Sequence, residues 1–168
     1  MDHMPWQALV FQSIPEGIIV TGLGLGLLGY YPPFKYVVSI GLINSLFSFF
    51  LLRRLPLPFG LHTLMHLVLL VFLIKIIIKK IEWWHAVTAV LLGTAVLGLA
   101  ESIFIPVLLQ LTGLTMDQVL RDTWLRVFFP LPHETVLGIL AYFIWRRRIS
   151  LPAFGTPVEG KRDVDSHD

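Results

Sequence analysis

Five apolar stretches, each close to the length that crosses a lipid bilayer, dominate this chain. They cover residues 6–30, 34–52, 61–78, 86–111 and 123–145. A transmembrane helix needs about 20 apolar residues to cross about 30 Å of hydrocarbon, and it satisfies its backbone polar groups internally. The pattern therefore predicts an all-α integral membrane protein, a bundle of about five transmembrane helices.

Composition excludes a soluble globule of this size. Of the 168 residues, 55% are hydrophobic and only 14% are charged, so polar surface is scarce. The absence of cysteine excludes disulfides, thiolate metal sites and cysteine nucleophiles. The basic pI, near 9.1, comes mostly from Lys and Arg at the segment ends. Lipid headgroups explain such charges better than nucleic acid does, so the bilayer is the expected partner and no nucleic acid is expected.

Turn-forming residues connect the apolar stretches and divide the chain. Tyr31-Pro32-Pro33 follows the first stretch, and a proline-rich segment, residues 55–60, precedes the third. Thr115-x-x-Gln118 matches a capping box and predicts a short interfacial helix. We expect residues 1–149 to form the transmembrane domain and residues 150–168, which are polar, to form a disordered cytoplasmic tail.

Positive charge is distributed unevenly between the two ends of the predicted helices. One end carries Arg53, Arg54, Arg121 and Arg126. The other carries Lys35, Lys75, Lys79, Lys80, Arg146, Arg147, Arg148, Lys161 and Arg162. Cytoplasmic loops are enriched in Lys and Arg. The distribution predicts a multi-pass protein of the cell membrane with its amino terminus outside and its carboxyl terminus in the cytoplasm.

Acids and histidines from four predicted helices fall in the outer half of the bilayer. Counting the helical rise of about 1.5 Å per residue places Glu16, Glu101, His133 and Glu134 about 15 Å deep and His66 about 8 Å deep. An ionisable group in hydrocarbon is costly and generally faces a partner, a cavity or a ligand. These five residues are therefore our candidates for a ligand-binding or proton-sensing site.

Prolines beside the acids allow two interpretations. Pro15 precedes Glu16, while Pro130 and Pro132 precede His133 and Glu134. A proline-broken transmembrane helix exposes backbone groups that need a cavity, water or a ligand. Alternatively, Ser13-x-x-Glu16 is a capping box that starts the first helix near Ser13, and Pro132-x-Glu134 is a helix start.

Glu101 has no capping role, because it lies inside a long apolar run. It shares a helix face with Thr94 and Gly98, and small residues at this spacing let another helix approach closely. Glu101 is then either a protonated group that bonds across helices or a contact to an ion, proton or ligand.

Two histidines lie on one face of the third stretch. His62 and His66 are four residues apart, so both could ligate one divalent metal ion or haem. The alternative is an interfacial His62 and a His66 that bonds to a neighbouring helix, since polar side chains often join transmembrane helices.

The glycines of the first stretch are interpreted as packing residues. Gly24-x-Gly26-x-x-Gly29 matches a dinucleotide-binding pattern, but it lies within an apolar span and follows no strand. Gly22-x-x-x-Gly26 has the spacing that permits close helix contact.

Several short motifs together resemble a known family. They are Ile14-Pro15-Glu16-Gly17, the segment from Leu55 to Thr63, the isolated Glu101 and Leu131-Pro132-His133-Glu134. In this order they resemble the amino-terminal five-span membrane region of bacterial GHKL-type sensor histidine kinases, over about residues 8–147. The resemblance implies a sensory input domain. The kinase part has no counterpart, because only a short tail follows Arg146–Arg148.

These observations favour a small membrane sensory or ligand-binding module with a buried Glu/His site, which signals to a partner protein or a second copy of the chain. One alternative is a metal- or haem-binding membrane subunit that uses His62, His66 and His133. Another is a component of an ion or proton transporter. Enzyme activity has the least support, because no catalytic geometry is recognisable.

Overall fold

The structure, a computed structural model, describes residues 6–51 and 61–151, and the side chain of His62 lies outside this description. Its secondary structure is helical, with no strand among the described residues. The proline-rich segment 55–60 and residues 152–168 of the predicted tail fall outside the described residues.

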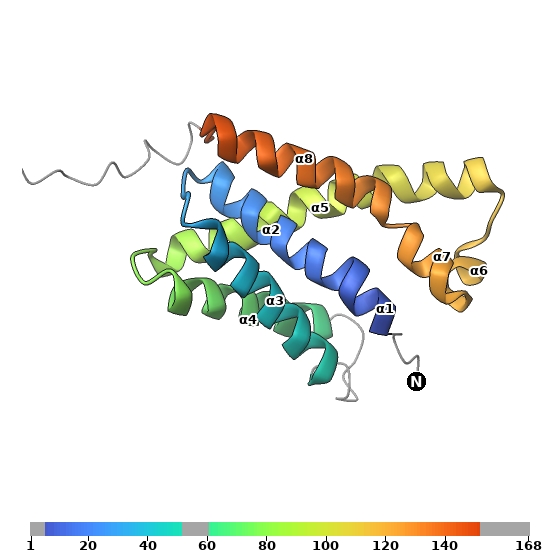
Figure 1. The fold of residues 1–168 in the computed structure, drawn as a ribbon, viewed down its shortest axis with the longest axis horizontal. Helices are drawn as coiled ribbons and strands as arrows, with labels where there is room; N and C mark the ends of the chain where they lie inside the picture. Colours follow the sequence, from blue (N-terminus) through green and yellow to red (C-terminus); the bar gives the residue numbers. More distant parts are fainter. Residues whose placement is uncertain (1–5, 52–60, 152–168) are drawn as a thin grey trace, which may run out of the picture.

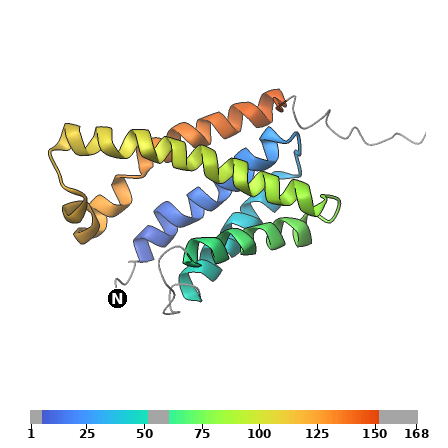
Figure 2. The ribbon, with the colours of Figure 1, turned by 180° about the vertical axis from the view of Figure 1, so that it is seen from behind.

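The longer helices of the described residues pack as a bundle (Figure 1). The elements in chain order are α1 (Trp6–Ala8), the π-helix η1 (Leu9–Ser13), α2 (Ile14–Leu27), α3 (Phe34–Phe50), α4 (Leu61–Ile77), α5 (Trp83–Thr112), α6 (Met116–Arg121), α7 (Thr123–Phe128) and α8 (Leu131–Arg147). Helix α2 packs against α3, α5 and α8, and α4 packs against α3 and α5. Seen from behind, the long helix α5 crosses the bundle (Figure 2).

Within the described residues, three helical segments are long and apolar enough to cross a membrane. They are Trp6–Leu27, Trp83–Thr112 and Thr123–Arg147. Helices α3 and α4 are apolar as well, but each has 17 residues. At about 1.5 Å per residue, 17 residues rise about 26 Å, which is short of the typical hydrocarbon thickness. The structure therefore supports an all-α membrane protein with three clear candidate spans.

Local signals place the helix ends. Gly29 and Gly113 have φ angles of 81° and 66°, a left-handed conformation that glycine adopts without steric cost and that ends α2 and α5. The predicted capping box is confirmed: Gln118 N–H donates to Thr115 Oγ1, and Thr115 N–H donates to Gln118 Oε1 at 2.8 Å. Because Gly29 ends α2, it is not one of the packing residues predicted for the first stretch.

The capping interpretation of Ser13 is wrong. Helix begins at Trp6, and Ser13 has helical dihedral angles with no side-chain capping bond. The chain widens into the π-turn η1 just before Pro15, and Ile14 N–H donates to Leu9 O. Proline has no N–H group and its ring crowds the preceding turn. A π-turn is one way in which a helix accommodates a proline. The helix is locally widened at this point and continues into α2.

The last apolar stretch is interrupted, as its prolines predict. Helix α7 ends at Phe128 and α8 begins at Leu131, with Pro132 in its first turn and Glu134 one turn into the helix. Proline is favoured at a helix start because its fixed φ suits the first turn and no partner for its nitrogen is needed there. The predicted helix start before Glu134 is confirmed.

Glycines bring α2 into backbone contact with its neighbours. A Cβ atom on Gly24 would overlap the backbone of Ala89, and one on Gly93 would overlap the backbone of Val20. A Cβ atom on Gly26 would lie 2.8 Å from Ile144 Cγ2. Small residues thus allow α2 to pack closely on α5 and α8, as predicted for Gly26. The prediction of close contact at Gly22 is wrong, because a Cβ atom there would lie 3.7 Å from its nearest neighbour, Val37 Cγ1. The prediction for Gly98 is wrong, because nothing lies within 4 Å of a Cβ atom built there.

One end of the bundle is closed by bonds between distant parts of the chain. Tyr31 Oη donates to the carbonyl oxygen of Ile149 at 2.9 Å, and Leu151 N–H donates to that of Leu27 at 2.8 Å. Trp145 Nε1 donates to the Gly22 carbonyl oxygen at 2.8 Å. These bonds hold the carboxyl end of α8 against the turn between α2 and α3.

Candidate functional site

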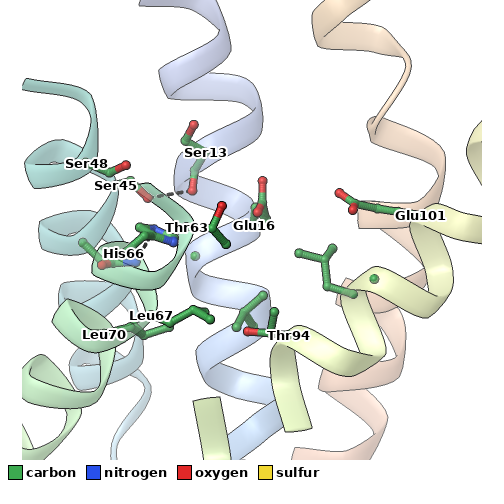
Figure 3. A pocket seen from close by; sticks show the side chains of 15 residues that line it. Ser13, Glu16, Ser45, Ser48, Thr63, His66, Leu67, Leu70, Thr94 and Glu101 are labelled. Atoms are coloured by element: carbon green, nitrogen blue, oxygen red, sulfur yellow. Dashed lines mark hydrogen bonds between the residues drawn. The ribbon is translucent and has the colours of Figure 1, made fainter. Parts of the chain in front are cut away.

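A pocket of about 300 Å³ opens between α2, α3, α4 and α5 (Figure 3). Apolar side chains of Val20, Leu67, Leu70 and Leu97 form part of its wall. The polar residues around it are Ser13, Glu16, Asn44, Ser45, Ser48, Thr63, His66, Thr94 and Glu101. Hydrogen-bonding groups from four different helices thus converge on one cavity inside a largely apolar bundle.

Three of the five predicted site residues line this pocket. Glu16 comes from α2, His66 from α4 and Glu101 from α5. In Figure 3, Glu101 projects from its helix toward the side of the pocket where Glu16 lies. Gly98, one turn before Glu101, also lines the pocket, so its missing side chain opens space that no helix fills.

Asn44 and His66 join α3 to α4. Asn44 Nδ2 lies 2.8 Å from His66 Nε2, and the Asn44 side chain is fully buried. If the amide nitrogen donates, Nε2 carries no proton and the imidazole is neutral. The predicted bond of His66 to a neighbouring helix is thus present. The interfacial position predicted with it for His62 concerns a side chain outside the described ones.

Asn44 keeps one acceptor atom without a protein partner. Its Oδ1 atom is buried and has no hydrogen bond among the described residues. A buried carbonyl oxygen without a partner costs about 1–3 kcal/mol, so such atoms usually bond to water or a ligand. This orphaned acceptor lies on a residue that lines the pocket.

Ser45 anchors α3 to the π-turn. Its hydroxyl group donates to the carbonyl oxygen of Ser13 at 2.6 Å (Figure 3). A Cβ atom on Gly41 would overlap Ile18, so α2 and α3 are also in close contact one turn away from Ser45. The serine bond and the glycine contact fix the pocket wall next to Glu16.

The two remaining site residues lie on α8, behind the pocket. His133 Nε2 is 3.9 Å from Glu101 Oε1, which is an ionic contact only when the histidine is protonated. His133 is 1% exposed and Glu134 is 4% exposed. The carboxyl group of Glu134 lies within electrostatic range of those of Glu16 and Glu101.

Glu134 is the buried acid of this group. Neither of its carboxyl oxygens has a hydrogen-bond partner among the described residues, although both are buried. Three helices, α2, α5 and α8, thus bring three carboxyl groups into one region of the bundle. The predicted polar layer corresponds to a spatial cluster of Glu16, Glu101, His133 and Glu134, with His66 on the far side of the pocket.

The metal interpretation stays a prediction. Among the described residues, no group of three His, Asp or Glu side chains has the geometry to hold a metal ion. His62 lies in the first turn of the same helix as His66, but its side chain lies outside the description.

Sequence reasoning missed the polar residues of α3. Asn44, Ser45 and Ser48 all lie in the stretch 34–52 and all line the pocket. The signal was present, because an asparagine within an apolar span rarely faces lipid. Asn44 carries no charge, so the pattern of ionisable side chains does not include it.

Comparison of the chain with known protein families, with curated proteins and with solved structures finds no match.

Proposed function

We propose that this protein is a membrane sensory or ligand-binding module whose pocket between α2, α3, α4 and α5 binds a small organic ammonium ion. The observation that carries the proposal is that Glu16, Glu101 and Asn44 line one cavity, and that the Asn44 amide oxygen has no hydrogen-bond partner among the described residues. Pockets of about 300 Å³ are at the lower end of the range for small molecules.

The chemistry of the lining favours a cation. Glu16 and Glu101 line the pocket and Glu134 lies near both, whereas no Lys or Arg is among the described lining residues. A carboxylate removed from water requires compensating charge, and an ammonium group supplies charge together with N–H donors. Asn44 Oδ1 offers a further acceptor, and the leucines of the wall suit the alkyl part of the ligand.

The route from the pocket to the end of the bundle runs through α8. Glu101 contacts His133, and from His133 α8 continues to Arg146 and Arg147. Because a ligand that binds Glu101 changes the charge next to His133, it favours one position of α8 relative to α5. A helix shift of this kind is a recognised means of switching. The partner that receives it is a signalling protein or a second copy of this chain.

We further propose that α3 and α4 also cross the bilayer, which gives five spans. Their packing against α2 and α5, and the polar pocket that they complete, support this count. The excess of Lys and Arg at one end supports a cell-membrane protein with residue 150 in the cytoplasm.

The test uses the full chain purified in detergent and ethylammonium as the probe. We expect ethylammonium to raise the thermal unfolding midpoint, since a ligand present at 100 times its Kd stabilises the folded state by about 2.7 kcal/mol. Acetate, which carries the opposite charge, should have no effect. Isothermal titration of the same samples gives the affinity.

Glu101→Gln is the decisive variant, and Glu82→Gln is its control. Glu82 immediately precedes the same helix, its side chain is 79% exposed, and it does not line the pocket. We expect Glu101→Gln to fold and to lose at least about tenfold in affinity, because a hydrogen bond to a charged group contributes about 1.5–3 kcal/mol. Equal ethylammonium affinity in the wild type, Glu101→Gln and Glu16→Gln would show that these acids bind no cation.

A further inference from the structure

A second groove, of about 600 Å³, lies between α2, α3 and α8. Its walls are largely apolar and include Ile18, Ile19, Val37 and Ala141. None of these four residues lines the pocket between α2, α3, α4 and α5 that contains Glu16 and Glu101, called the acidic pocket below. The groove is therefore a distinct feature on another side of α2.

Two glycines keep this groove open. A Cβ atom on Gly138 would have one neighbour within 4 Å, Ile19 Cδ1 at 3.8 Å, and one on Gly22 would lie 3.7 Å from Val37 Cγ1. Neither position is held against a neighbouring backbone, in contrast to Gly24 and its contact with Ala89. The absence of side chains at Gly22 and Gly138 thus leaves space between α2, α3 and α8.

Aromatic residues shape the end of the groove near the α2–α3 turn. Trp145 is held in place by its bond to the Gly22 carbonyl oxygen, and its ring packs edge-on against that of Phe34 at 6.4 Å between centroids. Phe34 and Tyr142 also line the groove and are exposed. Aromatic side chains of this kind are typical of the membrane–water interface.

One positive charge stands at this end. Arg146 lines the groove and donates from Nη1 to Tyr142 Oη at 2.8 Å, so its guanidinium group is oriented beside the aromatic rim. Arg146 is the one formally charged residue among the described lining. Lys35 follows Phe34, and Arg147 and Arg148 follow Arg146, which makes this end of the bundle basic.

We propose that this groove binds one anionic phospholipid, with an acyl chain between α2, α3 and α8 and the phosphate at Arg146. The apolar walls match hydrocarbon, and the arginine at one end matches a phosphate, which it can bind through two N–H groups. Basic sites between transmembrane helices are known to hold anionic headgroups. This site does not depend on the cation proposed for the acidic pocket.

The experiment counts lipids retained by the full chain in native mass spectrometry. The protein is purified in detergent and mixed with either phosphatidylglycerol or phosphatidylcholine of the same acyl chains. We expect one retained phosphatidylglycerol and weaker retention of phosphatidylcholine. Arg146→Gln should reduce phosphatidylglycerol retention about fivefold, because one basic residue near the membrane surface strengthens binding to anionic lipid by about this factor. Retention of phosphatidylcholine should be unchanged.

Two further variants test whether the lipid occupies the groove. Gly138→Leu places a side chain into the space and should reduce retention of both lipids, and Ala141→Leu should do the same from the next turn. Val136→Leu is the matched control, because Val136 is exposed on α8 and does not line the groove.

Three results would overturn the proposal. The first is equal retention by the groove-filling variants and Val136→Leu. The second is an equal loss with Arg121→Gln, an exposed arginine on α6, since that would indicate general attraction to anionic lipid. The third is displacement of the lipid by millimolar inorganic phosphate, which would show that Arg146 binds a free anion and not a lipid headgroup.

Discussion

Gly93 and Gly98 offer a direct test of the helix packing, because they lie on the same helix and differ in surroundings. Gly93 is buried, and a Cβ atom there would overlap the Val20 carbonyl oxygen and lie 3.0 Å from the carbonyl carbon. Gly98 is exposed, and nothing lies within 4 Å of its added Cβ. We expect Gly93→Ala to destabilise the protein and Gly98→Ala to leave it as stable as the wild type or more so.

The magnitude follows from two terms. Replacing glycine by alanine inside a helix gains about 1 kcal/mol of helix propensity at either position. At Gly93 the overlapping atoms belong to the α2 backbone and cannot rotate away, so α2 and α5 must separate. Overpacking of this kind costs about 1–3 kcal/mol, occasionally more. Because the propensity gain is common to both variants, the difference between them measures the packing cost, about 1–3 kcal/mol.

The assay is reversible unfolding of the full chain in detergent micelles, followed by circular dichroism during a titration with sodium dodecyl sulfate. The free energies of unfolding of both variants are compared with that of the wild type. If Gly93→Ala and Gly98→Ala agree within about 0.5 kcal/mol, the usual range for neutral substitutions, then α2 and α5 are not in backbone contact at this crossing.

Three further predictions concern the site and the topology. Glu134→Gln should insert and fold like the wild type but lose the response to ethylammonium or pH, since the amide keeps the size and removes the charge; an intact response would make Glu134 a structural residue. Reporter fusions should place residue 150 in the cytoplasm and the loop at Arg121 outside, and reversed signals would invert the orientation. If His62 and His66 bind a metal ion or haem, replacing either by alanine should abolish stoichiometric binding, whereas wild-type protein purified without metal or haem would dismiss that alternative.

The level of a residue along its helix depends only on its position along the chain, so the sequence alone predicts it. The rise per residue places Glu16, Glu101, His133 and Glu134 at one level before any packing is known. The structure brings these four side chains into one region. Their functional role is still a prediction, since depth and proximity are geometric properties.

Lateral contacts were harder to predict, because they depend on how each helix is rotated about its axis. The spacing of Thr94, Gly98 and Glu101 correctly indicated one shared face, but it did not tell whether that face meets a helix or a cavity. The structure places a pocket there and puts the close crossing at Gly93. Both glycines look alike in sequence, since each lies in an apolar run.

The first helix shows how local signals compete. Ser13, Pro15 and Glu16 match a helix start, yet the helix begins at Trp6 and continues through the π-turn η1. Ala8 and Leu9, which precede Ser13, are buried in the bundle. Backbone groups without hydrogen-bond partners are also costly in a bilayer. Tertiary burial thus outweighs the capping pattern.

Hydropathy alone predicted a helical chain with segments able to cross a membrane, because the need to bond every backbone group in hydrocarbon leaves a chain of long apolar segments few alternatives. Turn chemistry likewise determined several helix ends, such as those at Thr115 and Leu131. The tertiary structure decided what lies between the helices: the Asn44–His66 bond, the acidic pocket and the groove at Arg146. These features arise from residues distant in sequence, so they exist only once helix rotation and packing are set.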